Sequence, residues 1–255
     1  MSGDRTGKSD PATLARGGQA RQLPKRFYTH VTVEARGGGH AVHLDGRPIR
    51  TPNKLVLVLP TSSMAAAIAE EWEAQREHID PMSMPLTRLA NSVRDQVDGR
   101  EVEVRADIAK YAGSDLLCYR AESPAELVAA QSAAWDSVLD WARESVGADF
   151  IVCTGLMPVD QTPASRAAIE AAVAPLKSFQ LASAHVMTTL LGSVVLTLAT
   201  EAGRLTPDEA WKAAHVDEDW QVTQWGADAE AARRQESRKI EFLAAVRLRR
   251  LLDDP

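Results

Sequence analysis

The first part of the chain alternates between hydrophobic and polar positions with a period of two. Valine or leucine recurs at every second position in residues 31–33 and 42–44, and a dense hydrophobic run follows at residues 55–59. Glycine-containing stretches at residues 37–39 and 45–46 separate these runs and supply the positive φ angles that tight turns need. The pattern predicts a small antiparallel sheet near the N-terminus.

Beyond residue 60 the hydrophobic period becomes that of a helix. Met64, Ile68 and Trp72 recur every four residues, and glutamates lie mostly outside this stripe, which favours a structural position in the core for Trp72. Prolines then break the helix. A segment opening at residue 86 and a helix around residues 102–111 follow, the latter ending near a glycine.

From residue 121 onward the pattern is helical almost to the end of the chain. A short hydrophobic segment just before it, residues 116–119, predicts one more strand. Ser123, Pro124 and Glu126 combine an N-cap, a proline at the first helical position and a capping-box glutamate. Residues 151–159 fit either a strand or an extended connector.

The remaining helices are expected to finish the chain. They are predicted at residues 163–173, 179–201 and 207–214, with a capping box opening the third, and a final charged helix follows. The buried stripe of that final helix is predicted to be Ile240, Leu243, Val246 and Leu251. The fold class is therefore α+β. We expect a disordered arm at residues 1–24, a β-rich domain with inserted helices at 25–120 and a helical domain at 121–255.

Composition and charge narrow the class of protein. With 255 residues, 45% of them hydrophobic and 25% charged, the chain has the composition of a soluble globular protein. A net charge of -6 argues against nucleic acid as a partner, because phosphate binding needs clustered positive charge. The basic residues near the C-terminus alternate with glutamates at helical spacing, which indicates a solvated helix face.

Compartment and membrane signals are weak or absent. Cys118 and Cys153 stand far apart without metal-ligand spacing, which favours small buried side chains in a reducing compartment. The longest hydrophobic stretch, residues 182–199, carries too many polar residues for a membrane span and predicts a buried core helix. No secretory signal precedes the fold, so we expect a cytoplasmic protein without membrane insertion.

The chain carries no signature of catalysis. It lacks a phosphate-binding loop, a nucleophile elbow and a zinc-protease motif. His40 and His43 lie three apart in a predicted strand, so their side chains would face opposite sides, and we expect neither a metal nor another cofactor. His185 fits a hydrogen-bonded core position, and Asp115 fits a turn. A small hydrolase using Asp115 with His185 stays open only if the two meet in a pocket.

Residues 216–228 are the strongest candidate for a binding site. Here Asp217, Glu218, Asp219 and Asp228 surround two tryptophans, Trp220 and Trp225, with no lysine or arginine among them. If Asp217 or Asp219 capped a helix, Glu218 would lie near its N-terminus, where the macrodipole favours a carboxylate. The tryptophans are five apart, about 140° around a helix, so both cannot reach one core in the same way. Acids beside an exposed indole are typical of protein-binding surfaces.

The chain resembles the ATP12 ("ATP twelve") family, the assembly chaperones of the F1 sector of ATP synthase. The resemblance covers residues 25–252 and rests on blocks in the family's order. They are RFY at 26–28, LDGRPIRTP at 44–52, EW at 71–72, MPLTRLAN at 84–91, YAGSDLLCYR at 111–120, Trp135, GS at 192–193, and DE, WQ and WG within 217–226. The resemblance implies a β-rich N-terminal and a helical C-terminal domain. It also implies a chaperone that binds the unassembled α subunit of F1 and prevents its aggregation until the β subunit replaces it.

The same resemblance assigns roles to particular residues. The family's acidic C-terminal motif falls on Asp217, Glu218, Trp220 and Trp225, which together with Asp228 form the candidate client-binding set. Trp72 is assigned a structural role. Apart from the resemblance, we favour structural roles for Arg88 and Asn91 too and expect them to bind buried carbonyl groups; the alternative is that their segment lines a groove. The implied protein is a bacterial, cytoplasmic, monomeric chaperone and not an enzyme. A nonspecific holdase or scaffold is the alternative, and a small hydrolase comes third.

Overall fold

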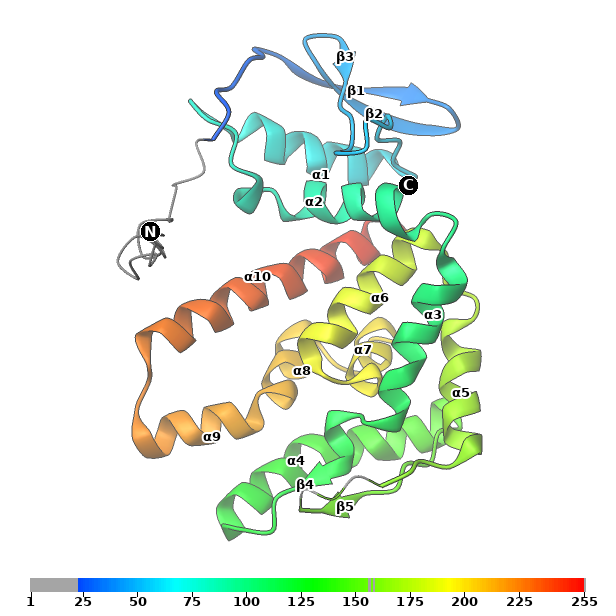
Figure 1. Ribbon diagram of the computed structural model, residues 1–255, viewed down its shortest axis with the longest axis vertical. Helices are drawn as coiled ribbons and strands as arrows, with labels where there is room; N and C mark the ends of the chain where they lie inside the picture. The colour runs from blue at the N-terminus through cyan, green and yellow to red at the C-terminus, as the bar shows by residue number, and fades with distance from the viewer. Residues whose placement is uncertain (1–22, 156, 158, 255) are drawn as a thin grey trace, which may run out of the picture.

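The computed structural model describes residues 23–155, 157 and 159–254 of the chain, so residues 1–22 of the expected arm lie outside it. Near the start of the described residues, the carbonyl oxygen of Pro24 accepts a hydrogen bond of 2.8 Å from the backbone N–H of Ile79. A small sheet and two helices cover one end of a larger helical body (Figure 1). This arrangement confirms the α+β class.

The antiparallel sheet is the one that the alternating pattern predicts. Strands β1 (Val31–Arg36), β2 (Gly39–Leu44) and β3 (Arg47–Pro48) lie in that order, with Val33 opposite Val42. Residues 55–59 do not form a further strand. They make isolated bridges to two different segments, at His40–Leu59 and Arg50–Val56, so no continuous ladder of hydrogen bonds forms.

Helix α1 (Ser62–Glu73) underlies the sheet and begins where the sequence predicts. The hydroxyl group of Thr61 accepts a hydrogen bond from the backbone N–H of Met64, and Met64 and Ile68 are buried. A 3-10 turn (Pro81–Ser83), α2 (Pro85–Ser92), a π-helical turn (Val93–Val97) and α3 (Glu101–Lys110) follow, and α3 ends in a 3-10 turn at Tyr111–Gly113. The predicted helices of this region are confirmed.

Two local predictions around residue 120 are wrong. Residues 116–118 form a 3-10 turn because the Asp115 carboxylate accepts the backbone N–H of Leu117, and only β4 (Tyr119–Arg120) is extended. It pairs in parallel with β5 (Cys153–Thr154), which is the short strand within residues 151–159. Helix α4 (Ala125–Trp141) has Pro124 in extended conformation as its N-cap and no side-chain capping bond, so the box expected from Ser123 and Glu126 does not form.

A long hydrophobic stretch is divided into two helices rather than one. After a π-helical turn at Ala142–Val146 and α5 (Pro163–Val173), α6 (Ser178–Leu191) ends at Gly192, whose φ of +66° is left-handed. The hydroxyl group of Ser193 then caps α7 (Val194–Glu201). The single helix predicted over residues 179–201 is therefore wrong, although most of both helices is buried. None of the helices in the described ranges is long and hydrophobic enough to cross a membrane.

The last helices carry the candidate site. Helix α8 (Pro207–Ala214) begins with the predicted capping box of Thr206 and Glu209, and α9 (Val216–Trp225) and α10 (Ala229–Arg250) follow. The stripe predicted for α10 is partly wrong, since Ile240 and Leu243 are 47% and 40% exposed. Val246 is buried as predicted, and the other residues of α10 that are buried are Phe242, Ala244, Ala245 and Leu248.

Hydrophobic side chains form two clusters, and α10 belongs to both. The larger cluster fills the helical body around Trp135, Leu181 and Phe242. The smaller one joins the sheet, α1 and α2 to Ala244 and Leu248 of α10. Residues up to α2 contribute to the smaller cluster, and the larger cluster begins directly after α2. Helix α3 belongs to the larger cluster and packs against α5 and α6. A domain boundary at residue 120 stays a prediction.

Candidate protein-binding surface

Helix α9 lies almost entirely outside the two cores. None of its residues is buried, and it packs against α4. The Asp217 carboxylate accepts a hydrogen bond of 2.7 Å from the side-chain amide of Gln131 on α4, which holds the first turn of α9 in place. Gly226, with a φ of +86°, then redirects the chain into α10.

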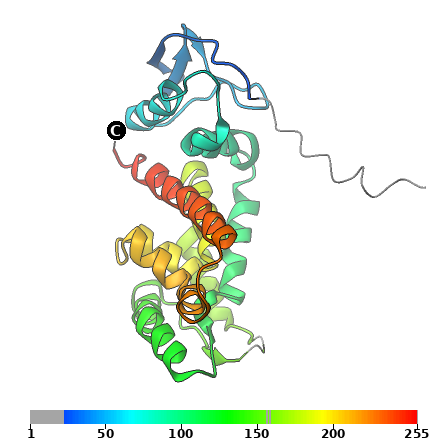
Figure 2. The same ribbon diagram turned by 90° about the vertical axis from the view of Figure 1, so that its left-hand side faces the viewer.

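The beginning of α10 is equally unprotected. Its first buried residue is Phe242, more than three turns from the N-terminus of the helix. Helix α9 and these first turns meet at the edge of the molecule as the two arms of a V (Figure 1), and Figure 2 shows the same pair from the side. We call residues 216–239 the α9–α10 V.

The acids of the α9–α10 V have distinct local roles. Asp217, Glu218 and Asp219 occupy the first turn of α9, where the helix dipole stabilises negative charge, but neither aspartate caps the helix, since the N-cap is His215. Asp228 is the N-cap of α10, and its Oδ1 accepts the backbone N–H groups of Glu230 (2.7 Å) and Ala231 (2.9 Å). These two hydrogen bonds, led by that of Ala231, lower the pKa of Asp228.

Its two tryptophans contact each other edge to face. The Trp220 and Trp225 rings lie 5.8 Å apart between centroids at an interplanar angle of 88°. Trp220 is half-buried, whereas Trp225 is 75% exposed. The prediction that the pair cannot share one core is confirmed, and Trp225 is a large aromatic surface without cover from the described residues.

A hollow of about 570 Å³ lies between the arms of the V. Glu218, Trp225 and Asp228 line it, while Asp217 and Trp220 do not. The α9 wall also contributes Asp219, Gln221 and Val222, and the α10 wall contributes Ala231, Ala232, Arg234, Gln235 and Arg238. One wall is thus acidic and the other basic.

Sequence reasoning missed the α10 wall of this hollow. Arg234 and Arg238 were assigned to a solvated helix face, and both are exposed, but they also border an apolar depression. The available signal was the pair Ala231 and Ala232, two small residues on a helix whose neighbouring side chains are charged. Small side chains let another backbone approach closely, which charge patterning alone does not reveal.

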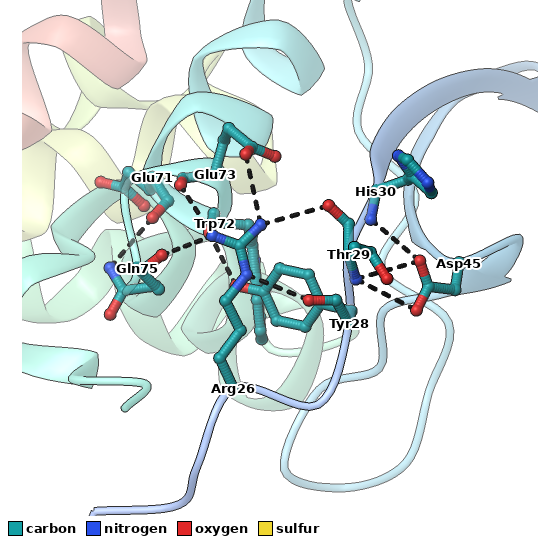
Figure 3. A network of polar contacts seen from close by, with 9 residues as sticks. All are labelled: Arg26, Tyr28, Thr29, His30, Asp45, Glu71, Trp72, Glu73 and Gln75. Atoms are coloured by element: carbon teal, nitrogen blue, oxygen red, sulfur yellow. Dashed lines mark hydrogen bonds and ion pairs between the residues drawn. The ribbon is translucent and has the colours of Figure 1, made fainter. Parts of the chain in front are cut away.

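The N-terminal segment is bound to α1 by a polar network (Figure 3). The hydroxyl group of Tyr28 donates to the carbonyl oxygen of Trp72 (2.6 Å), and their rings lie 5.8 Å apart. The Arg26 guanidinium donates to the carbonyl oxygen of Gln75 (2.5 Å). On the other side of Figure 3, Asp45 accepts the backbone N–H groups of Thr29 and His30, which lower its pKa.

Glu71 and Arg88 connect helices, whereas in the described part of the chain Asn91 does not. The Glu71 carboxylate, whose pKa burial raises, accepts the backbone N–H groups of Leu86 (2.8 Å) and Thr87 (2.7 Å) at the start of α2. Arg88 forms an ion pair with Glu241 of α10, so its partner is a carboxylate and not the expected carbonyl group. Asn91 is half-buried, and its side chain makes no hydrogen bond with the residues that the structure describes.

Asp115 and His185 do not form an active site. Asp115 is fully buried, and its carboxylate accepts the backbone N–H groups of Leu117 and Val195, both at 3.1 Å, while burial raises its pKa to about 6. His185 is half-buried on α6, and no hydrogen bond of its ring is seen in the described part of the chain, so the core position expected for it is wrong. A dissolved substrate cannot reach Asp115, which ends the hydrolase interpretation.

Other candidate chemistry is likewise structural. Cys118 is buried, which raises the pKa of its thiol to about 12, and Cys153 is half-buried beside it, its Sγ 3.5 Å from the Cys118 carbonyl oxygen. His43 is buried in the sheet, with one ring nitrogen 3.2 Å from the Ala41 carbonyl oxygen. Within residues 23–254, less the two gaps, no three histidine, cysteine or acidic side chains are grouped as metal ligands.

Comparison with known proteins identifies relatives along nearly the whole chain. The family described as "ATP12 chaperone protein" matches residues 25–143. The crystal structure of Atp12 from Paracoccus denitrificans is 41% identical, has a TM-score of 0.85 and aligns over 90% of this chain and 98% of its own. A putative chaperone from Agrobacterium tumefaciens is 42% identical, with a TM-score of 0.88 over 96% and 92% of the two chains. The mitochondrial protein atp12 of Schizosaccharomyces pombe is 20% identical over 216 residues, 80% of this chain and 74% of that protein.

Proposed function

Because the chain belongs to the ATP12 family of chaperone proteins, we propose that it assists the assembly of the F1 sector of ATP synthase by binding the unassembled α subunit. The observation that supports this most strongly is the α9–α10 V, two consecutive helical arms without a buried residue that enclose an apolar and charged hollow. Helices gain most of their stability in proteins from packing, so exposed arms of this kind fit a surface that a partner covers.

The physical requirement for such a chaperone is a limited contact. An isolated F1 α subunit exposes an interface that is apolar at its centre and prone to aggregation. A protein that covers this interface and later leaves it needs a moderate area with a few anchors. Trp225 supplies an exposed aromatic anchor, and Glu218 supplies a negative charge that has no ion-pair partner in the described part of the chain. The β subunit then displaces the chaperone by burying a larger area on the same client.

The proposal also names the cellular compartment and the oligomeric state of the protein. Two of the similar solved structures come from bacteria, Paracoccus denitrificans and Agrobacterium tumefaciens, which supports a bacterial member. We place the protein in the cytoplasm as a monomer that performs no catalysis. Its buried carboxylate Asp115 is occupied by backbone hydrogen bonds, and this supports a structural role for the acid that most resembled a catalytic one.

A nonspecific holdase is the competing function. Large hydrophobic side chains are also exposed away from the α9–α10 V, at Phe27 (72%), Met82 (66%) and Val102 (77%). A holdase would use such dispersed positions and bind many unfolded chains. A dedicated chaperone would bind the α subunit through one surface, so client selectivity separates the two functions.

The test is capture of F1 α and β subunits co-expressed with the tagged protein. The unchanged protein is expected to retain α and not β. Trp225→Ala and Glu218→Lys should each reduce α capture about tenfold or more, because loss of a central anchor costs on the order of 2 kcal/mol. Both side chains are exposed, so circular dichroism should show an unchanged fold.

Two matched variants control this experiment. Glu236→Lys makes the same charge reversal on α10 outside the hollow, and Met82→Ala removes an exposed hydrophobic side chain far along the sequence from it. Both should leave α capture within about twofold, the scatter expected for surface changes. Equal capture of α and β, or full α capture by both Trp225→Ala and Glu218→Lys, would refute the proposed function.

A further inference from the structure

The hollow of the α9–α10 V has the form of a helix bundle that lacks one helix. Its two walls are helices that share the connection at residues 226–228 and enclose the space between them. Val222 and Trp225 stand three positions apart on α9, and Ala231, Ala232 and Gln235 occupy one side of α10. Each wall therefore offers largely exposed side chains to the space between the two helices.

We propose that this hollow binds an amphipathic helix of the client, which lies between α9 and α10 as a third helix. This inference rests on the proposed function and names the structural element of the client that is recognised. Helix axes in packed pairs lie about 8 to 10 Å apart, and the close end of that range needs small residues at the contact. Ala231 and Ala232 meet this need on α10, while Trp225 provides the large hydrophobic side chain on the opposite wall.

The order of residues along the V also predicts where the client helix carries its hydrophobic, basic and acidic residues. Near the connection the hollow is lined by Val222 and Trp225 of α9 and by Ala231 and Ala232 of α10, and the only charged group there is the Asp228 carboxylate, which caps α10. Further from the connection, α9 presents Glu218 and Asp219, and α10 presents Arg238. A helix that fits carries hydrophobic residues toward the connection, a basic residue on the side that faces α9 and an acidic residue on the side that faces α10.

These charges are available for a partner. Neither Glu218 nor Asp219 forms an ion pair with any residue in the described ranges. Arg238 donates only to the carbonyl oxygen of Leu190, at 3.0 Å, which leaves its positive charge uncompensated by a carboxylate. Opposite charges on the two walls disfavour a uniformly basic or acidic segment. An amphipathic helix with mixed charges satisfies both walls.

A steric block tests this inference without altering charge. Ala232→Trp fills the space between the arms, and Ala229→Trp places the same side chain on the same exposed stretch of α10 but outside the hollow. Ala232→Trp is expected to reduce capture of the co-expressed F1 α subunit about tenfold, and Ala229→Trp to leave it unchanged. Circular dichroism of both variants should match the unchanged protein.

The helical form of the ligand is tested with synthetic peptides. Twenty-residue peptides that cover the F1 α subunit are added to the capture experiment as competitors and examined for helical circular dichroism on binding. We expect one peptide to compete, to gain helical signal, and to lose both effects when a central residue is replaced by proline. Binding by an extended peptide, or no competition by any peptide, would overturn the inference.

The outcomes distinguish this inference from the function on which it rests. Loss of α capture by Glu218→Lys and Trp225→Ala with full capture by Ala232→Trp keeps the proposed function and rejects the inserted helix. Unchanged capture in all three variants rejects the function itself. A dimer of this chain that Ala232→Trp dissociates would show that a second copy fills the hollow, and this too contradicts the inference.

Discussion

Asp115 illustrates how the surroundings of a single residue decide its role. In the sequence it follows a glycine and a serine and resembles a turn residue. In the structure it is fully buried and binds two backbone segments, at Leu117 and at Val195, the second of them 80 residues further along the chain than Asp115 itself. Its carboxylate thus fixes both the turn before β4 and the start of α7. No periodicity in the sequence indicates such a long-range contact.

This position gives a testable dependence of stability on pH. Burial raises the pKa of Asp115 from 3.8 to about 6, so between these values the folded protein holds a proton that the unfolded chain has released. The resulting stabilisation is complete below about pH 4 and is lost as the pH rises through about 6. At about 1.4 kcal/mol per pKa unit, the loss is about 3 kcal/mol.

Asp115→Asn removes the titrating group and provides the comparison. The free energy of unfolding, measured by urea denaturation, should fall by about 3 kcal/mol more for the unchanged protein than for Asp115→Asn between pH 4 and pH 7. Taking the difference cancels the other titrating groups, including Glu201, whose pKa burial raises to about 7. Parallel pH profiles for the two proteins would show that Asp115 is not protonated by burial.

Elements with a local signal were predictable from the sequence. The sheet, α1, α5 and α8 follow from alternation, helical stripes and caps such as Thr206. The errors occur where a distant group competes with the local pattern. The break between α6 and α7 depends on the left-handed Gly192 together with the N-cap Ser193, and a hydrophobic stretch hides both.

Helix α10 shows that the buried face of a helix cannot always be predicted from the spacing of its own hydrophobic residues. Its hydrophobic residues cover more than one face, and which face is buried depends on neighbours on two sides, the helical body and the sheet with its helices. The client-binding candidates were found for a different reason. The cluster of acids and tryptophans at residues 217–228 is unusual in composition, and only the three-dimensional structure divides it into hollow-lining and structural residues.

Adjacent residues of α10 provide a sharp check of its orientation. Phe242 is fully buried and contacts Trp211, with ring centroids 5.5 Å apart, whereas Leu243 is 40% exposed. Phe242→Ala should lower the free energy of unfolding by about 3 to 5 kcal/mol, because it leaves a cavity in the larger cluster. Leu243→Ala should lower it by less than about 1 kcal/mol in the same urea titration. The reverse order would mean that the stripe predicted from the sequence is the buried one.

At the scale of the whole molecule, the packed part of α10 and its share of the exposed binding surface lie in different halves of the helix. Helix α10 contributes to both hydrophobic clusters. At its C-terminal end, the carbonyl oxygen of Leu251 accepts a hydrogen bond of 2.7 Å from the hydroxyl group of Thr61, which precedes α1. The C-terminal half of α10 is therefore a fixed support. The α9–α10 V continues from this support, and none of its residues is buried (Figure 1). A binding surface held on such a support keeps its geometry while it stays open to a client.

Amide hydrogen exchange of the protein alone and bound to the F1 α subunit tests this account most directly. Exposed helical arms with little packing should exchange fast in the free protein, and a client between them should slow that exchange. We predict strong protection on binding across residues 216–239, with little change in the sheet and α1. Protection of the sheet and α1 with none in residues 216–239 would contradict the account and place the client at the opposite end of the molecule.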